Sequence, residues 1–400
     1  MPAKVAATVT ADPAGQTYTL TTGIDTVTGT GNRDTIHATQ ATLTADLTGW
    51  TGVQTVRVAN TGAAVPVTVT TASASNVVVK GGTRVKVTDT DGALKSVSLD
   101  GLTGEARLVG DGLTKVALAN SRGPGAYIMI DNRTMDHAIE LALHNATGRS
   151  LVWDPEATAF TMTVTGASDI TPDFPIAETL AVKGTAVAAF DATRLSTLRT
   201  VTVSEAAGIN TDLSSLSTLT SVDTLASTGT STVRTHADVA YTGGAGRDSV
   251  TVVGAPTQAI GLGGGDDTVV LADGVGAGGS VEGGAGTDTL SVSAVQAVAL
   301  AGSAGVSGFE RLAIRGVTVP MTLDLARLGN IRHLAVADVT DRDAGRLTVT
   351  KSTCPRRVRC TTPSWMQPLA IGSGSPSTAA PRPSWRPRSP RMPGWGTRIT

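Results

Sequence analysis

Three glycine-rich loops that each end in an aspartate are the residues of this chain best suited to chemistry. Two of them, 243–251 and 283–291, match the nine-residue pattern G-G-x-G-x-D-x-U-x, with U apolar, at every specified position. The third, 262–270, differs only by a leucine at its first position. Glycine lets the backbone turn sharply with its carbonyls pointing inward, and the aspartate adds a carboxylate. Ca²⁺ takes six to eight such oxygen ligands at about 2.3–2.6 Å.

The spacing of the loops predicts that they stack. Asp248 and Asp267 are 19 residues apart, and Asp267 and Asp288 are 21 apart. Two nonapeptides form one coil of about eighteen residues, so the three aspartates are expected on one edge of a roll. One loop supplies only half a coordination shell, which predicts about two calcium sites, each shared by adjacent loops. The alternative is a set of glycine turns that closes a metal-free solenoid. The candidate calcium ligands are Gly243, Ala245, Gly246, Asp248, Gly263, Gly264, Gly265, Asp266, Asp267, Gly283, Ala285, Gly286 and Asp288.

The elements that would position these loops belong to a longer repeat. An aspartate followed by apolar residues at +4, +7, +10 and usually +12 begins at Asp46, Asp191, Asp212 and Asp324. Steps of about 19–21 residues are too short for a domain and suit one coil of a solenoid. Alternating segments such as 201–203 are typical of strands. We therefore predict an all-β, elongated parallel β-solenoid with a β-roll segment. An antiparallel β-sandwich and a leucine-rich-repeat horseshoe are the alternatives, although the asparagine ladder of the horseshoe is absent.

Composition agrees with small repeating units. Only twelve aromatic residues occur among 400, while 40% of the residues are apolar and 46 are glycine. A collagen-like repeat, a disulfide scaffold and a transmembrane helix are excluded, and 1–15 contains no apolar signal-peptide region. The net charge of −1 conceals an acidic body of about −10 and a basic tail, 351–400, which has nine Lys or Arg and no acidic residue.

The glycine-aspartate loops resemble the RTX, or hemolysin-type calcium-binding, repeats of proteins exported by type I secretion. The wider body resembles Thr-rich surface-layer and adhesin-like RTX proteins. This resemblance implies a β-roll that folds on Ca²⁺ outside the cell, an extracellular or cell-surface location without an N-terminal signal peptide, and assembly into a surface lattice. Segment 18–36 looks like an N-terminal element of such proteins. There, however, Asn32 replaces a glycine, and Asp25 and Asp34 fall on opposite edges, so calcium and a plain turn both stay open.

These observations divide the chain into five expected segments. The loops define the calcium-binding β-roll, and the repeat frame defines the solenoid on either side of it. The predicted segments are an N-terminal RTX-like β segment at 1–60, Thr-rich solenoid repeats at 61–240, the RTX roll at 241–295, a further solenoid repeat at 296–350 and the tail at 351–400.

No motif predicts an enzyme or a nucleic-acid partner. Segment 274–279 satisfies G-x-G-x-x-G but precedes another calcium loop rather than a helix. The five histidines are scattered without zinc spacing. A paired-carboxylate glycosidase stays open, although no aromatic cleft is available to stack sugars. We predict a calcium-binding structural protein. The alternatives are an adhesin that binds glycan or lipopolysaccharide, and the RTX part of a hydrolase without a recognisable catalytic domain.

The tail has two interpretations. Its Pro, Arg and Trp clusters suit a basic arm that binds anionic partners. The same residues are what a GC-rich coding sequence yields in a shifted frame, which predicts that the native body continues past Val349. The tail does not resemble the C-terminal export signal of the family.

Overall fold

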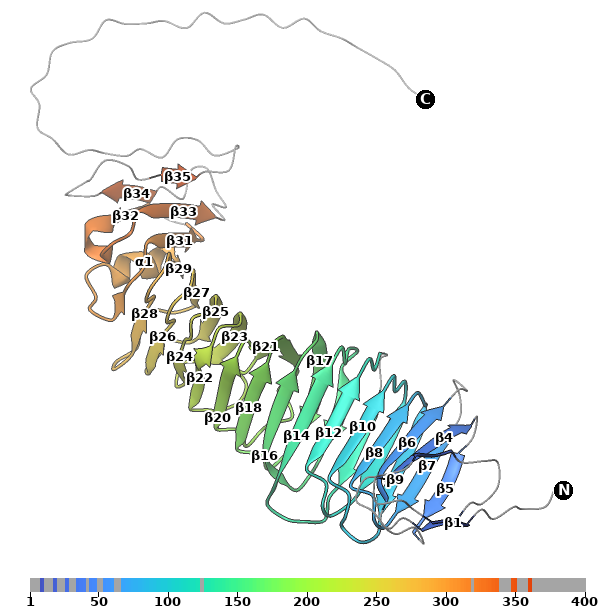
Figure 1. Cartoon of the computed structure of the whole chain (residues 1–400). Helices are drawn as coiled ribbons and strands as arrows, with labels where there is room; N and C mark the ends of the chain where they lie inside the picture. Colours follow the sequence, from blue (N-terminus) through green and yellow to red (C-terminus); the bar gives the residue numbers. More distant parts are fainter. Residues whose placement is uncertain are drawn as a thin grey trace, which may run out of the picture.

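The chain winds into an elongated stack of two-stranded coils (Figure 1). Its computed structural model describes residues 8–10, 17–19, 26–28, 34–40, 43–48, 53–60, 66–122, 126–317, 320–337, 347–350 and 359–361. Successive strands alternate between two long sheets, so that each coil contributes one strand to each sheet.

The first long sheet contains fifteen strands, which pair in parallel. Each strand neighbours those one coil before and one coil after it. Its strands are β2 (Thr17–Thr19), β4 (Asp34–Gln40), β6 (Val53–Asn60), β8 (Asn76–Lys80), β10 (Ser96–Asp100), β12 (Lys115–Ala119), β14 (His137–His144), β16 (Ala157–Val164), β18 (Thr179–Gly184), β20 (Thr200–Glu205), β22 (Ser221–Ser227), β24 (Ala240–Thr242), β26 (Ala259–Gly261), β28 (Ser280–Glu282) and β30 (Val306–Ser307).

The second long sheet contains sixteen strands, again paired in parallel. It includes the strands that follow the glycine-aspartate loops. Its strands are β5 (Leu43–Leu47), β7 (Pro66–Thr71), β9 (Arg84–Asp89), β11 (Glu105–Val109), β13 (Tyr127–Asp131), β15 (Ser150–Trp153), β17 (Ser168–Asp173), β19 (Val187–Phe190), β21 (Gly208–Asp212), β23 (Ser231–His236), β25 (Asp248–Val253), β27 (Thr268–Leu271), β29 (Thr289–Ser293), β31 (Arg311–Arg315), β33 (His333–Ala337) and β35 (Arg359–Thr361).

Smaller elements lie near the two ends. Two further parallel pairs join β1 (Thr8–Thr10) to β3 (Thr26–Thr28) and β32 (Met321–Asp324) to β34 (Leu347–Thr350). A short helix, α1 (Ala294–Leu300), follows β29, and a 3₁₀ turn, η1 (Leu325–Leu328), follows β32. The predicted parallel β-solenoid is confirmed. Parallel pairing excludes the antiparallel sandwich, and the second sheet takes the place that helices occupy in a horseshoe.

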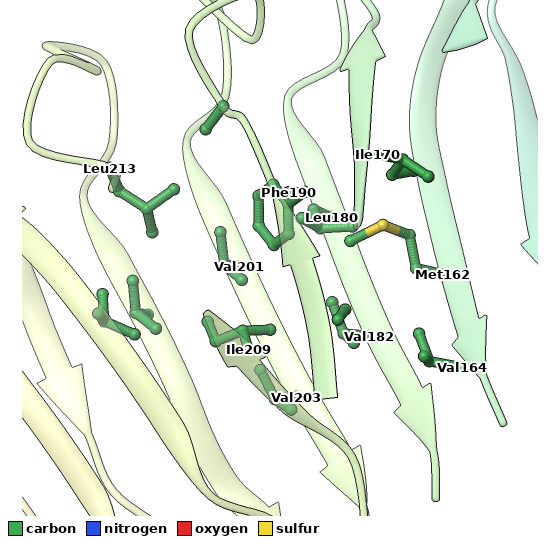
Figure 2. Packing of buried hydrophobic residues seen from close by; sticks show 14 of the residues in the cluster. Met162, Val164, Ile170, Leu180, Val182, Phe190, Val201, Val203, Ile209 and Leu213 are labelled. Atoms are coloured by element: carbon green, nitrogen blue, oxygen red, sulfur yellow. The ribbon is translucent and has the colours of Figure 1, made fainter. Parts of the chain in front are cut away.

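The core is a set of apolar columns that run along the solenoid. On the first sheet, residues one coil apart pair directly, so one column passes through eight consecutive strands. Each member is at most 2% exposed, which contributes about 1.5–3 kcal/mol per side chain. Figure 2 shows three of them beside the facing residues of the second sheet. The column is Val56, Val77, Val97, Val116, Leu141, Met162, Val182 and Val203.

The Asp-x-x-x-Leu frame forms a corner of the coil. The Oδ1 atom of Asp212 accepts the backbone N–H of Ser214 at 2.9 Å, which is the Asx turn that aspartate favours. Leu213, Leu216 and Leu219 then turn inward and are buried. The repeat frame therefore encodes one carboxylate outside and a run of leucines inside.

Several predictions fall on other parts of the chain. The five segment boundaries stay predictions. Asp25 and Asn32 lie outside the described residues, whereas Asp34 begins β4. Of the tail at 351–400, only the backbone of β35 is described, where it pairs with β33.

Candidate calcium-binding site

The three glycine-aspartate loops lie at the same corner of consecutive coils. Each loop connects a strand of the first sheet to a strand of the second sheet, namely β24 to β25, β26 to β27 and β28 to β29. Val250 pairs with Val269, and Val269 pairs with Leu290, so the apolar residues after the aspartates form one buried column. The aspartates two positions earlier therefore share one edge, as their spacing predicts.

The aspartates form a ladder that links one coil to the next. The backbone N–H of Asp248 donates to Oδ1 of Asp267 at 2.7 Å, and the N–H of Asp267 donates to Oδ1 of Asp288 at 2.9 Å. Asp267 is 1% exposed and Asp288 is fully buried. The second oxygen, Oδ2, of each is buried without a hydrogen-bond partner. Two charged oxygens are thus left uncompensated, which is costly in a protein interior.

The electrostatics of the ladder reflect this lack of compensation. Burial above all, together with the nearby carboxylates of Asp248, Asp288 and Asp266, raises the pKa of Asp267 to about 6, against the opposing effect of the hydrogen bond from the N–H of Asp248. Burial likewise raises the pKa values of Asp248 and Asp288. A bound cation would favour the charged forms of these carboxyl groups.

The glycines allow the loops to stack in direct backbone contact. Gly284 has φ +97°, and a Cβ atom there would lie 1.9 Å from the carbonyl oxygen of Gly263. A Cβ at Gly286, which has φ +141°, would lie 1.7 Å from the carbonyl oxygen of Gly265. No other residue type fits these positions unless the backbone shifts. The stack brings carbonyl oxygens of one loop against the backbone of the next.

The carbonyl and carboxylate oxygens of the loops suit a hard cation as ligands. The carbonyl of Gly263 accepts the N–H of Ala285 at 2.8 Å, and that of Ala285 accepts the N–H of Gly265 at 2.9 Å. Each carbonyl oxygen has two lone pairs, so one hydrogen bond leaves capacity for a metal. Among the described residues, no three His, Cys, Asp or Glu side chains gather around one point. A cation here would therefore combine Asp267 and Asp288 with backbone carbonyls.

The remaining predicted ligands occupy distinct places in the stack. Exposed Asp266 ties two loops together, because its Oδ1 atom accepts the N–H of Thr287 at 2.9 Å. The predicted residues at buried backbone positions are Gly243, Gly246 and Gly283; Gly263, Gly264 and Gly265 are half-buried, and Ala245 and Ala285 are exposed at the loop tips.

Asp248 differs from the other two aspartates. Its Oδ1 atom accepts the N–H of Ser231 at 3.2 Å, and its Oδ2 atom accepts the hydroxyls of Tyr241 at 2.8 Å and Thr224 at 3.2 Å. Sequence reasoning did not identify Tyr241 and Thr224, which lie 7 and 24 residues away. It also missed Glu310, whose Oε2 atom accepts the N–H of Asp288 at 3.0 Å.

A second polar site lies on the outer face of the second sheet. A groove of about 710 Å³ spans several coils there, and carboxylates, arginines, hydroxyls and an amide line it. Arg149 lies 3.7 Å from Asp169, and Arg234 lies 3.5 Å from Asp212. Between them, the Thr193 backbone N–H and hydroxyl hold the pKa of Asp191 below its usual value.

The resemblance to RTX repeats rests on the motif residues alone. No protein-family model matches the chain, and no curated protein matches it in sequence. The part of the chain that the structure describes contains no helix long and apolar enough to cross a membrane.

Proposed function

We propose that this protein is a calcium-dependent structural protein of the bacterial surface, whose glycine-aspartate roll becomes rigid when it binds Ca²⁺. The observation that carries the proposal is the pair of buried, unpartnered Oδ2 atoms on Asp267 and Asp288 within a stack of glycine backbones. The long solenoid around this roll is a scaffold with two exposed sheet faces, which suits a surface-layer or adhesin-like role and self-assembly.

Charge explains why calcium would control rigidity. Without a cation, the buried carboxylates repel one another, and the glycine loops lose much conformational entropy when they order. Extracellular calcium modules bind at about 10⁻⁴–10⁻³ M. The roll would therefore stay loose in a calcium-poor cytosol and become ordered after export, which supports a secreted or cell-surface location.

A calcium titration of the whole chain tests this proposal. We expect the β-sheet circular dichroism signal and the melting temperature to rise with CaCl₂ and to fall again in EGTA. Mg²⁺ should have a smaller effect because it requires a stricter geometry. The double variant Asp267→Asn/Asp288→Asn should lose the response. The proposal would be contradicted if the circular dichroism signal and the melting temperature of the wild type changed with neither CaCl₂ nor EGTA.

Glycan binding is a second candidate because of the groove over the second sheet. Asp191, Asp212 and Asn210 line it beside Arg234, and these groups hydrogen-bond readily to sugar hydroxyls. A glycan screen of wild type against Asp191→Ala/Asp212→Ala tests this role. Binding that both proteins share would place any glycan site elsewhere, and absence of binding in both would favour a purely structural protein.

A further inference from the structure

The carboxylate ladder continues beyond the last glycine-aspartate loop. Glu310 lies 22 residues after Asp288 and takes the position that the next aspartate would occupy: the N–H of Asp288 donates to its Oε2 atom at 3.0 Å. In return, the N–H of Glu310 donates to the carbonyl of Asp288 at 3.2 Å. Glu310 is therefore the fourth carboxylate of the ladder, although its segment departs from the nonapeptide pattern at Val306 and at the glutamate itself.

The backbone before Glu310 also stacks like a fourth loop. The corner between β30 and β31 contains Gly308, which has φ +74°. The carbonyl of Ser307 accepts the N–H of Gly283 at 3.0 Å. A Cβ atom on Gly283 would lie 2.1 Å from the carbonyl oxygen of Gly308. The carbonyl oxygens of this corner thus approach the backbone of the third loop about as closely as the loops approach one another.

The other end of the ladder is closed by hydroxyl groups. Tyr241 is buried beside Asp248. Its hydroxyl and that of Thr224 both donate hydrogen bonds to the Oδ2 atom of Asp248, which would otherwise face a cation. Thr224 also accepts the N–H of Gly244 at 3.1 Å, which fixes the first loop to the coil before it. Asp248 is thus fully hydrogen-bonded without metal, whereas Asp267 and Asp288 are not.

We propose that the divalent-cation sites lie one coil further toward the C-terminus than the motif spacing predicts, with Glu310 as a ligand and Asp248 as a metal-free end. One site would use the loops of Asp267 and Asp288, and the next would use Asp288 with Glu310 and the corner at Gly308. This inference rests on the proposed calcium binding and changes which residues carry it.

Calcium titration calorimetry on the full chain and its single variants tests the assignment. Glu310→Gln keeps an oxygen that can accept the N–H of Asp288, so its melting temperature in EGTA should equal that of wild type. It should nevertheless lose one equivalent of Ca²⁺, or bind it about tenfold or more weakly, because the ligand charge is gone. Asp248→Asn should keep the wild-type stoichiometry and affinity.

Glu178→Gln supplies the matched control. Glu178 directly precedes β18 in the first sheet, as Glu310 directly precedes β31 in the second; it pairs with Arg199 at 3.2 Å, and no glycine-aspartate loop precedes it. It should bind Ca²⁺ like wild type. If Asp248→Asn loses a site while Glu310→Gln does not, the assignment is wrong but the calcium proposal survives. If wild type binds no Ca²⁺, both fail.

Discussion

The rings of Phe160 and Phe174 stack inside the solenoid with their centroids 4.5 Å apart and their planes inclined by 21°. Phe160 comes from β16, and Phe174 follows β17, so the pair joins the two sheets. Both are buried, with exposures of 2% and 0%. In a chain with four phenylalanines, this pair is a concentrated source of packing.

Phe174→Ala should therefore destabilise the middle coils by about 3–5 kcal/mol, because it leaves a cavity opposite Phe160. Hydrogen exchange of the β16 and β17 amides measures this locally and does not require two-state unfolding. Met135→Ala is the control, since Met135 is 73% exposed and should change stability by less than about 0.5 kcal/mol. Equal exchange in the two variants would show that the pair contributes nothing.

Gly243→Ala should destabilise the roll by about 1–3 kcal/mol because of steric overlap alone. A Cβ atom there would lie 1.8 Å from the carbonyl oxygen of Leu262, in the next coil. Gly274→Ala is a matched control, because nothing lies within 4 Å of its Cβ position. Neither glycine has a positive φ, so the difference in melting temperature reports the close approach of the coils. Equal melting temperatures would contradict this account.

In EGTA, the roll should become less stable as the pH rises from about 4 to 6. The pKa of Asp267 is about 6 in the fold, above the ordinary 3.8, so the folded state holds more protons in this window. The loss from this carboxyl is on the order of 3 kcal/mol. Melting temperatures in EGTA at several pH values measure the trend, and Asp267→Asn should flatten it. An identical pH profile in that variant would refute the assignment to Asp267.

His137→Ala should cost about 1–3 kcal/mol, because it removes the side-chain partner of a buried carboxylate and leaves it only backbone N–H groups. The Nε2 atom of His137 lies 2.9 Å from Oδ2 of Asp154, which is fully buried and whose pKa burial raises despite this bond. His144→Ala is the control, since exposed His144 contacts the neutral hydroxyl of Thr165 at 3.1 Å. Chemical denaturation of both variants compares them, and similar midpoints would remove any special role for His137.

The solenoid and the alignment of the aspartates follow from periodicity. A repeat of about twenty residues brings identical positions into neighbouring strands, so the frame shared by Asp191 and Asp212 already implies that they lie one coil apart. The fold class and the common edge of Asp248, Asp267 and Asp288 could therefore be predicted. Calcium binding itself stays a prediction.

The ends of the ladder could not be predicted from a motif. Tyr241 and Thr224 act on Asp248 through side-chain contacts that no spacing rule specifies. Glu310 did carry a signal, because it continues the step of about twenty residues after Asp288. The pattern is less conspicuous there because, although Gly305 and Gly308 remain, Val306 replaces the second glycine and a glutamate replaces the aspartate.

The ladder also gives the roll a polarity. Each carboxylate accepts an N–H from the coil that precedes it, so every coil is completed by the one that follows in the chain. Cutting the stack from its C-terminal side leaves an amide without its carboxylate acceptor, whereas cutting it from the N-terminal side leaves a carboxylate without its amide donor. The two ends of a trimmed roll therefore present different groups to solvent, a free carboxylate at the N-terminal end and a free N–H at the C-terminal end.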